Sequence, residues 1–172
     1  EQATFEQLPD AFVLGASRLV PYKALDKVIE TGARVGLPVV IAGDGPDTRR
    51  LSDFAQHSSS AVTFLGPVSN AMLYALMQQA SVYVFPPVED FGIMPVEAMA
   101  LGTPVVVADR GGATESLAAV GYGVTVDFAN AEAVRDSALR AIALKGRQDF
   151  SAVAQFDRST FVDGIRAKVT SS

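Results

Sequence analysis

Six short apolar runs, separated by segments with helical spacing, most constrain how this chain folds. The runs consist mainly of Val, Ile, Leu, Phe, Tyr, Ala and Gly, with Thr63, Pro104 and Thr125 as the exceptions, and most of them lack the polar alternation of a half-exposed strand. Strands buried on both faces have this composition and are typical of parallel sheets covered by helices. The predicted strands are 12–16, 39–42, 62–65, 82–85, 104–108 and 123–126. The pattern predicts an α/β fold, a three-layer, doubly wound (Rossmann-like) parallel sheet of about six strands.

Helical segments are predicted between these strands. In 23–35 apolar residues recur at helical spacing, and Gly36 ends the pattern. Further helices are predicted over 46–57, 70–79, 95–101, 113–119 and 130–144. A last helix, 159–169, has no strand after it, so we expect it to dock outside the sheet.

Length and composition exclude several classes of protein. A chain of 172 residues fits one domain, 1–172, and its lack of cysteine excludes disulfides and thiolate metal sites. The net charge of −5 argues against nucleic acid as a partner, because backbone binding needs a basic face. No apolar run approaches the roughly 18 residues of a membrane span. The N-terminus is acidic and resembles no signal peptide, so we expect a cytoplasmic location; the lack of a starting Met suggests a fragment or a processed chain.

Loops rich in Gly, Pro and polar residues follow the predicted strands. Carboxyl ends of parallel strands lie on the same edge of a sheet, and ligands bind in the crevice beyond them. We therefore expect one ligand site at this edge. The loops are 17–23, 43–46, 66–69, 88–94 and 109–112.

Two cations lie after the first predicted strand. Arg18 offers a planar fork of donors and Lys23 a mobile point charge, and both suit a diphosphate. The alternative is that both are solvated surface charges. A cation at a helix N-terminus costs a few tenths of a kcal/mol, which weakly favours a functional role.

Two carboxylates flank a Phe-Gly turn between a strand and a helix. Glu97 is expected as the third helical residue after Pro95, where the helix dipole and capping also favour a Glu, so a structural role is equally open. Glu89 has no such explanation, because it lies in a loop beside another carboxylate. The backbone N–H groups of 91–94, at the helix start, suit a phosphate or a sugar oxygen. Together these groups outline a site for a nucleotide sugar.

The turn 42–46 contains Gly43 and Gly45, which let the backbone approach a phosphate or a ribose. A plain tight turn is an equally open interpretation. The third glycine of the dinucleotide fingerprint is missing, which argues against a dehydrogenase. His57 is the single histidine, and the sequence contains no catalytic triad, metal-ligand cluster or Walker loop.

Taken together, the motifs resemble the C-terminal, donor-binding domain of retaining glycosyltransferases of the GT-B fold, family 4, group 1. The resemblance runs from about residue 12 to 144, and several ordered motifs carry it. They are Arg18 with Lys23, 42–46, 64–66, Glu89-x7-Glu97 within 89–106, and Gly111-Gly112-x-x-Glu115. Segments 18–26 and 89–97 look most like mannosyltransferases that use GDP-mannose in building surface polysaccharide.

The resemblance implies a role for each matching residue. Arg18 and Lys23 would hold the donor diphosphate and stabilise the leaving group, and Glu89 would bind the donor-sugar hydroxyls. The other implied donor-binding residues are Gly43 and Gly45, Val68 and Leu73 in the base pocket, Phe91, Gly92, Ile93 and Met94 around sugar and phosphate, and Glu97 on the ribose. The glycine that usually follows the family's lysine is Ala24 here, which bears on the backbone path of that loop.

The implied activity is transfer of a hexose, mannose favoured, from a nucleoside-diphosphate sugar to a glycan or lipid-linked acceptor. GDP-mannose is the favoured donor, and UDP- and ADP-sugars are alternatives. No cofactor is implied, and metal-independent transfer is expected, in keeping with the absence of an Asp-x-Asp motif.

Enzymes of the GT-B fold have two domains with the active site between them, so an N-terminal acceptor domain is expected outside this chain. The segment 155–172 resembles the helix that crosses back to that domain. Through that domain the enzyme could lie peripherally on the inner face of a membrane, and the isolated 172-residue domain is expected to be nearly inactive. A GT-B-fold sugar-nucleotide epimerase and a non-catalytic nucleotide-binding module are the alternative functions.

Overall fold

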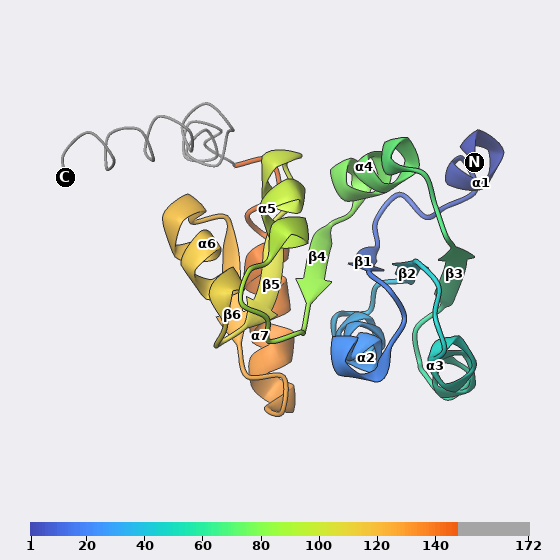
Figure 1. Cartoon of the computed structure of the whole chain (residues 1–172), viewed down its shortest axis with the longest axis horizontal. Helices are drawn as coiled ribbons and strands as arrows, with labels where there is room; N and C mark the ends of the chain where they lie inside the picture. Colours follow the sequence, from blue (N-terminus) through green and yellow to red (C-terminus); the bar gives the residue numbers. More distant parts are fainter. Residues whose placement is uncertain (148–172) are drawn as a thin grey trace, which may run out of the picture.

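The computed structural model describes residues 1–147, which form one twisted sheet with helices on both faces (Figure 1). The helix predicted in 155–172 lies outside the described residues. All neighbouring strands are parallel, in the order β3-β2-β1-β4-β5-β6. The strands are β1 (Val13–Ala16), β2 (Val39–Ala42), β3 (Val62–Gly66), β4 (Val82–Phe85), β5 (Val105–Ala108) and β6 (Gly123–Val126). The predicted doubly wound α/β fold is confirmed.

Helices cover the two faces of the sheet in groups of three. One face packs against α2, α3 and α7, and the other packs against α4, α5 and α6. The helices are α1 (Gln2–Phe5), the 3-10 turn η1 (Pro21–Lys23), α2 (Leu25–Val35), α3 (Thr48–Ala55), α4 (Asn70–Gln79), α5 (Ile93–Ala100), α6 (Gly112–Val120) and α7 (Ala131–Ile142). Side-chain oxygens of Ser69 and Asn130 cap α4 and α7.

Burial on both faces explains the continuous apolar runs. Val13 and Leu14 are consecutive in β1 and fully buried, yet they belong to opposite apolar clusters on the two faces of the sheet. Every residue of β1, β2, β4 and β5 is buried in the same way. The edge strands β3 and β6 are partly exposed.

Two predicted helix starts were wrong in a way that affects the site. The helix expected from Lys23 begins at Leu25, because Ala24 adopts a left-handed conformation (φ 49°, ψ 45°) that separates η1 from α2. The helix expected from Pro95 begins at Ile93. Proline is tolerated there because the first backbone N–H groups of a helix have no intrahelical acceptor.

Among the residues that the structure describes, no helix has the length and apolar character needed to cross a membrane.

Candidate functional site

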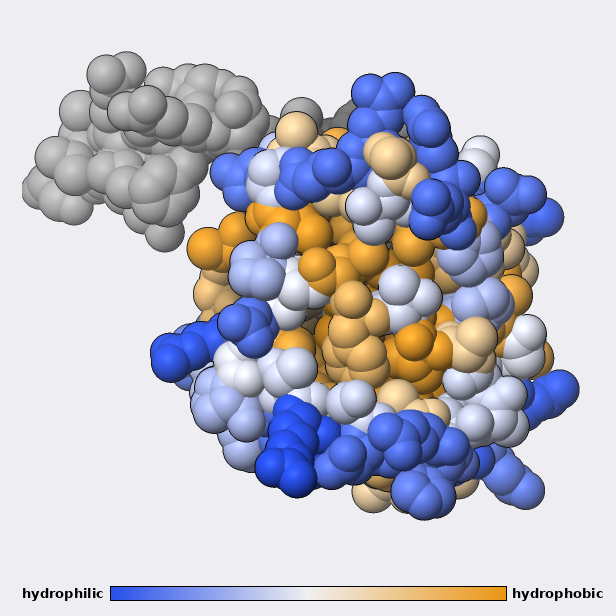
Figure 2. Space-filling model, turned by 90° about the vertical axis from the view of Figure 1, so that its right-hand side faces the viewer, coloured by the Kyte–Doolittle hydropathy of each residue, from blue (hydrophilic) through white to orange (hydrophobic). Residues whose placement is uncertain are grey.

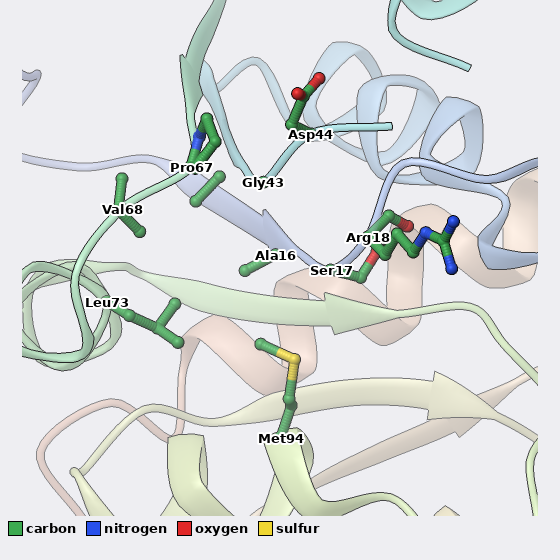
Figure 3. A pocket seen from close by; sticks show the side chains of 10 residues that line it. Ala16, Ser17, Arg18, Gly43, Asp44, Pro67, Val68, Leu73 and Met94 are labelled. Carbon is green, nitrogen blue, oxygen red and sulfur yellow. The ribbon is translucent and has the colours of Figure 1, made fainter. Parts of the chain in front are cut away.

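A hollow of about 290 Å³ opens at the carboxyl edge of the sheet, where β1 lies between β2 and β4 (Figure 3). This is the point where the strand order reverses, and it is where open α/β sheets bind ligands. Its lining comes from the ends of three strands and the starts of two helices. The lining residues are Ala16, Ser17, Arg18, Ala42, Gly43, Asp44, Pro67, Val68, Leu73 and Met94.

The hollow has an apolar end and a polar end. Val68 and Leu73 line it from the β3–α4 side, and Met94 reaches toward them from the start of α5 (Figure 3). Arg18 lies at the other end, exposed, and pairs with no carboxylate within residues 1–147. A flat apolar group fits one end and an anion the other.

Asp44 lines the hollow although it was not among the site residues predicted from the motif 42–46. Its Oδ1 accepts hydrogen bonds from the Gly45 backbone N–H at 2.7 Å and from Thr48 Oγ1 at 3.2 Å. The carboxylate points away from the centre of the hollow (Figure 3). These bonds give Asp44 a structural role at the start of α3.

Lys23 and Glu89 form an ion pair beside the hollow, although they are 66 positions apart in sequence. Their side chains are 15% and 26% exposed, so water screens the pair only in part. The Lys23 Nζ also lies 5.2 Å from the Tyr22 ring centroid and 5.8 Å from the Phe85 ring centroid. The structure thus brings together two of the residues predicted from sequence.

Two glycines hold the backbone of the Glu89 loop. The Gly112 N–H donates to the Glu89 carbonyl at 2.7 Å. A Cβ at Gly112 would lie 1.9 Å from the Asp90 carbonyl oxygen, and Gly111 has a φ of +90°. The glycine pair is therefore required for the close approach that fixes the loop.

Glu97 is the fifth residue of α5, so the interpretation of Glu97 as a helix-start residue is wrong. Its side chain is half-buried, and its Oε1 lies 3.5 Å from the hydroxyl of Tyr74 on α4. Neither the helix dipole nor a cap explains a carboxylate there.

The remaining predicted residues of this loop do not line the hollow. Phe91 and Ile93 are 54% and 62% exposed. Gly92 is the N-cap of α5, and no side chain caps that helix start. The first backbone N–H groups of α5 are therefore available to an anion.

Gly43 and Gly45 serve mainly to pack two loops together. Gly43 has a φ of +122°, and a Cβ there would lie 1.9 Å from the Ser17 carbonyl oxygen. A Cβ at Gly45 would lie 2.2 Å from the Leu19 carbonyl oxygen. Gly43 lines the hollow and Gly45 does not. Their expected contact with a donor stays a prediction.

Tyr83 is a residue near the site that the sequence interpretation missed. It is fully buried in β4, and its hydroxyl donates to the Ala16 carbonyl at 3.0 Å. Burial raises the pKa of Tyr83, and the charges of Glu97 and Glu89 raise it further. Both carboxylates therefore act on this hydroxyl. The sequence feature that could have identified Tyr83 is a hydroxyl-bearing side chain within a strand that is predicted to be buried on both faces.

The fold and the hollow define a Rossmann-like ligand-binding domain. Residues 1–155 match the family described as glycosyl transferases group 1, and the chain belongs to that family.

Curated relatives include mycobacterial enzymes. The chain is 33% identical over 140 residues to the GDP-mannose-dependent alpha-(1-6)-phosphatidylinositol monomannoside mannosyltransferase of Mycobacterium tuberculosis, covering 73% of this chain and 36% of that protein. It is 34% identical over 164 residues to the D-inositol 3-phosphate glycosyltransferase of Mycolicibacterium smegmatis, covering 87% of this chain and 38% of that protein. Because the chain spans so little of these relatives, the activity of the whole protein is a matter for proposal.

Solved structures of glycosyltransferases share the fold. The crystal structure of Anabaena HepE in complex with UDP-glucose matches 99% of this chain and 51% of that chain, with a TM-score of 0.77 and 24% identity. AviGT4, a glycosyltransferase involved in avilamycin A biosynthesis, matches with a TM-score of 0.72 and 20% identity, covering 93% of this chain and 49% of that chain.

Residues 1–147 contain no group of three His, Cys, Asp or Glu side chains that could hold a metal ion. Metal-independent transfer stays a prediction.

Proposed function

We propose that this chain is the donor-binding part of a retaining hexosyltransferase that uses a nucleoside-diphosphate hexose. The observation that carries the proposal is that Arg18 lines the hollow at the reversal point of the sheet, with the Lys23–Glu89 ion pair beside it. GDP-mannose is the favoured donor, supported by the name of the tuberculosis relative. The acceptor would be a glycan or a lipid-linked sugar, bound by a second domain.

In this proposal each part of the donor has its own partner. The base enters the apolar end, between Val68 and Leu73, and the ribose hydroxyls donate to Glu97. The diphosphate meets Arg18, Lys23 and the uncapped start of α5. Glu89 binds the hydroxyls of the hexose.

The chemistry needs the nucleoside diphosphate to leave as an anion. When the anomeric C–O bond breaks, negative charge develops on the β-phosphate oxygen. Preorganised cations and helix N–H groups stabilise such charge in the transition state and cost no reorganisation at that moment. Glu89 orients the sugar and is not assigned as a nucleophile.

A thermal-shift panel tests the donor site. We expect one of GDP, UDP or ADP, and its hexose conjugate, to stabilise the chain selectively. A ligand at a hundredfold excess over its dissociation constant adds about 2.7 kcal/mol to the free energy of unfolding. Melting temperatures unchanged by every nucleotide would exclude the proposed function.

Substitutions of the two carboxylates separate their roles. Glu97→Ala should weaken all ribose-bearing ligands, by about tenfold for the loss of a charge-assisted hydrogen bond. Glu89→Ala should not weaken GDP binding and should remove the preference for GDP-mannose over GDP. Asp90→Ala, at the exposed neighbour of Glu89, is the matched control and should change neither affinity. Equal losses for GDP and GDP-mannose in Glu89→Ala would contradict the assigned role.

A further inference from the structure

Tyr83 lies beside the hollow, in the central strand β4 of the sheet. It occupies β4 opposite Leu14 of β1, is 0% exposed, and is the largest fully buried side chain of the described chain. It is not among the residues that line the hollow. A buried tyrosine hydroxyl needs a hydrogen-bond partner, and the partner that it takes fixes its surroundings.

The hydroxyl of Tyr83 contacts two residues that line the hollow from different elements. It donates to the carbonyl oxygen of Ala16 at 3.0 Å and lies 3.7 Å from the Sδ of Met94. Ala16 is the last residue of β1, immediately before Ser17 and Arg18. Met94 is the second residue of α5. One hydroxyl thus joins the loop that carries Arg18 to the helix start that offers its backbone donors.

The surroundings keep this hydroxyl protonated. Burial raises the pKa of Tyr83, and the nearby carboxylates of Glu97 and Glu89 raise it further, since a phenolate would repel them. The raised pKa favours the protonated form of Tyr83, which is the hydrogen-bond donor.

We propose that the Tyr83 hydroxyl is a positioning group that holds the Arg18 loop and the start of α5 in the one arrangement that binds a diphosphate. This inference rests on the proposed function, because it concerns the diphosphate part of the same site. Tyr83 would act through Ala16 and Met94 without touching the ligand. Its loss should weaken a nucleoside diphosphate and the corresponding sugar conjugate equally.

Tyr83→Phe is the direct test, because it removes the hydroxyl and keeps the ring. Tyr122→Phe is the matched control. Tyr122 is 4% exposed, and its hydroxyl accepts from the Gly146 N–H at 3.1 Å and lies 3.4 Å from the Gly102 carbonyl. It immediately precedes β6, at the amino edge of the sheet and away from the hollow. Both variants lose one buried hydroxyl, so both should be destabilised to a similar degree.

Calorimetric titration with GDP, UDP and their hexose conjugates gives the readout, at a temperature where all variants are folded. We expect about tenfold weaker binding of the preferred nucleotide to Tyr83→Phe, which corresponds to about 1.4 kcal/mol, and unchanged binding to Tyr122→Phe. Wild-type affinity in Tyr83→Phe, or equal losses in both variants, would overturn the positioning role alone. A wild-type chain that binds none of these nucleotides would overturn the proposed function.

Amide hydrogen exchange tests the coupling without any nucleotide. The Ser17 N–H donates to the Ala42 carbonyl at 3.1 Å, and the Val96 N–H donates to the Gly92 carbonyl at 3.4 Å. Tyr83→Phe should speed exchange at both amides, and Tyr122→Phe at neither. Unchanged exchange at either amide of Tyr83→Phe would overturn the proposal.

The wild-type chain supplies a second measurement should Tyr83→Phe not fold. Native-state exchange at low urea gives the opening free energy of each amide. If Tyr83 joins the Arg18 loop to the start of α5, Ser17 and Val96 open with the same free energy. Different opening free energies would show that the two segments move independently and would refute the coupling.

Discussion

Arg50 joins two helices on the α2/α3 side of the sheet, and Asp47 at the start of α3 is its most buried partner. The Asp47 side chain is 5% exposed and accepts two hydrogen bonds of 2.7 Å from the Arg50 guanidinium. Arg50 Nη2 also donates to Asp26 Oδ1 on α2 at 3.0 Å. These bonds hold the pKa of Asp47 below its ordinary value of 3.8. The carboxylate therefore stabilises the fold above pH 3.8, and that stability is lost as the pH falls through the lower, folded-state pKa.

Asp47→Asn should lower the free energy of unfolding by about 1 to 2 kcal/mol at pH 7. The figure is modest because Arg50 is 49% exposed and water screens its charge. Urea unfolding over a pH series should show the difference from wild type shrinking below pH 3.8. Asp53→Asn, an exposed carboxylate of the same helix, is the control and should show no such trend. A difference that stays constant down to about pH 2.5 would rule out the ionic contribution.

Residue chemistry and strand order together sufficed to place Arg18, Lys23 and Glu89 at one edge of the sheet, because parallel strands end on the same side. Their pairing was not predictable. The Lys23–Glu89 ion pair depends on the path of the chain between two residues that are 66 positions apart, and the hydroxyl of Tyr83 looked like part of an apolar run. Periodicity in the sequence indicates which residues are buried. Which side chains pair with each other depends on how loops that are far apart in the sequence come together in the fold.

At the scale of elements, the conformation of Ala24 determines the junction between η1 and α2. Ala24 is the one non-glycine residue with positive φ in the part of the chain that the structure describes. The resembled family usually has glycine here, and Ala24 keeps the left-handed conformation that a glycine adopts readily. An alanine in that conformation costs about 1 to 2 kcal/mol.

Ala24→Gly should therefore stabilise the chain slightly. The strain that it relieves exceeds the extra chain entropy of glycine, about 0.5 to 1 kcal/mol, so we expect a gain of about 0.5 kcal/mol in urea unfolding. Gly36→Ala is the reverse control. Gly36 has a φ of +71° with open space around its Cα, so the added methyl should cost about 1 kcal/mol without a clash. A destabilised Ala24→Gly would mean that the junction is not strained.

At helix boundaries, the tertiary structure can override the local start and stop signals in the sequence. The strand ranges at 39–42, 82–85 and 123–126 were predicted correctly, because doubly buried or turn-flanked runs have clear limits. The start of α5 was placed two residues late, since Pro95 suits the first helical position but is also tolerated at the third. That difference of two residues removed the structural explanation for Glu97.

At the scale of the whole molecule, the two apolar clusters share one sheet and should unfold together. Leu76 of α4 and Leu51 of α3 are both 0% exposed and lie on opposite faces. Leu76→Ala and Leu51→Ala should each lower the free energy of unfolding by about 2 to 5 kcal/mol. Far-ultraviolet circular dichroism and tyrosine fluorescence should give coincident urea transitions in both variants. Separate transitions would mean that the faces are independent units.

The Lys23–Glu89 ion pair means that the site supplies its own counter-ion. On the proposed assignment, a ligand that carries only an anionic group would pair with the Lys23 ammonium. The partly buried Glu89 carboxylate would then have no partner, which costs free energy. A ligand that carries both an anion and sugar hydroxyls replaces each partner with a new one. On that assignment the pair would discriminate against inorganic phosphate and against the spent nucleotide. In this way Glu89, which does not itself contact the phosphate, would favour the replacement of bound product by fresh donor.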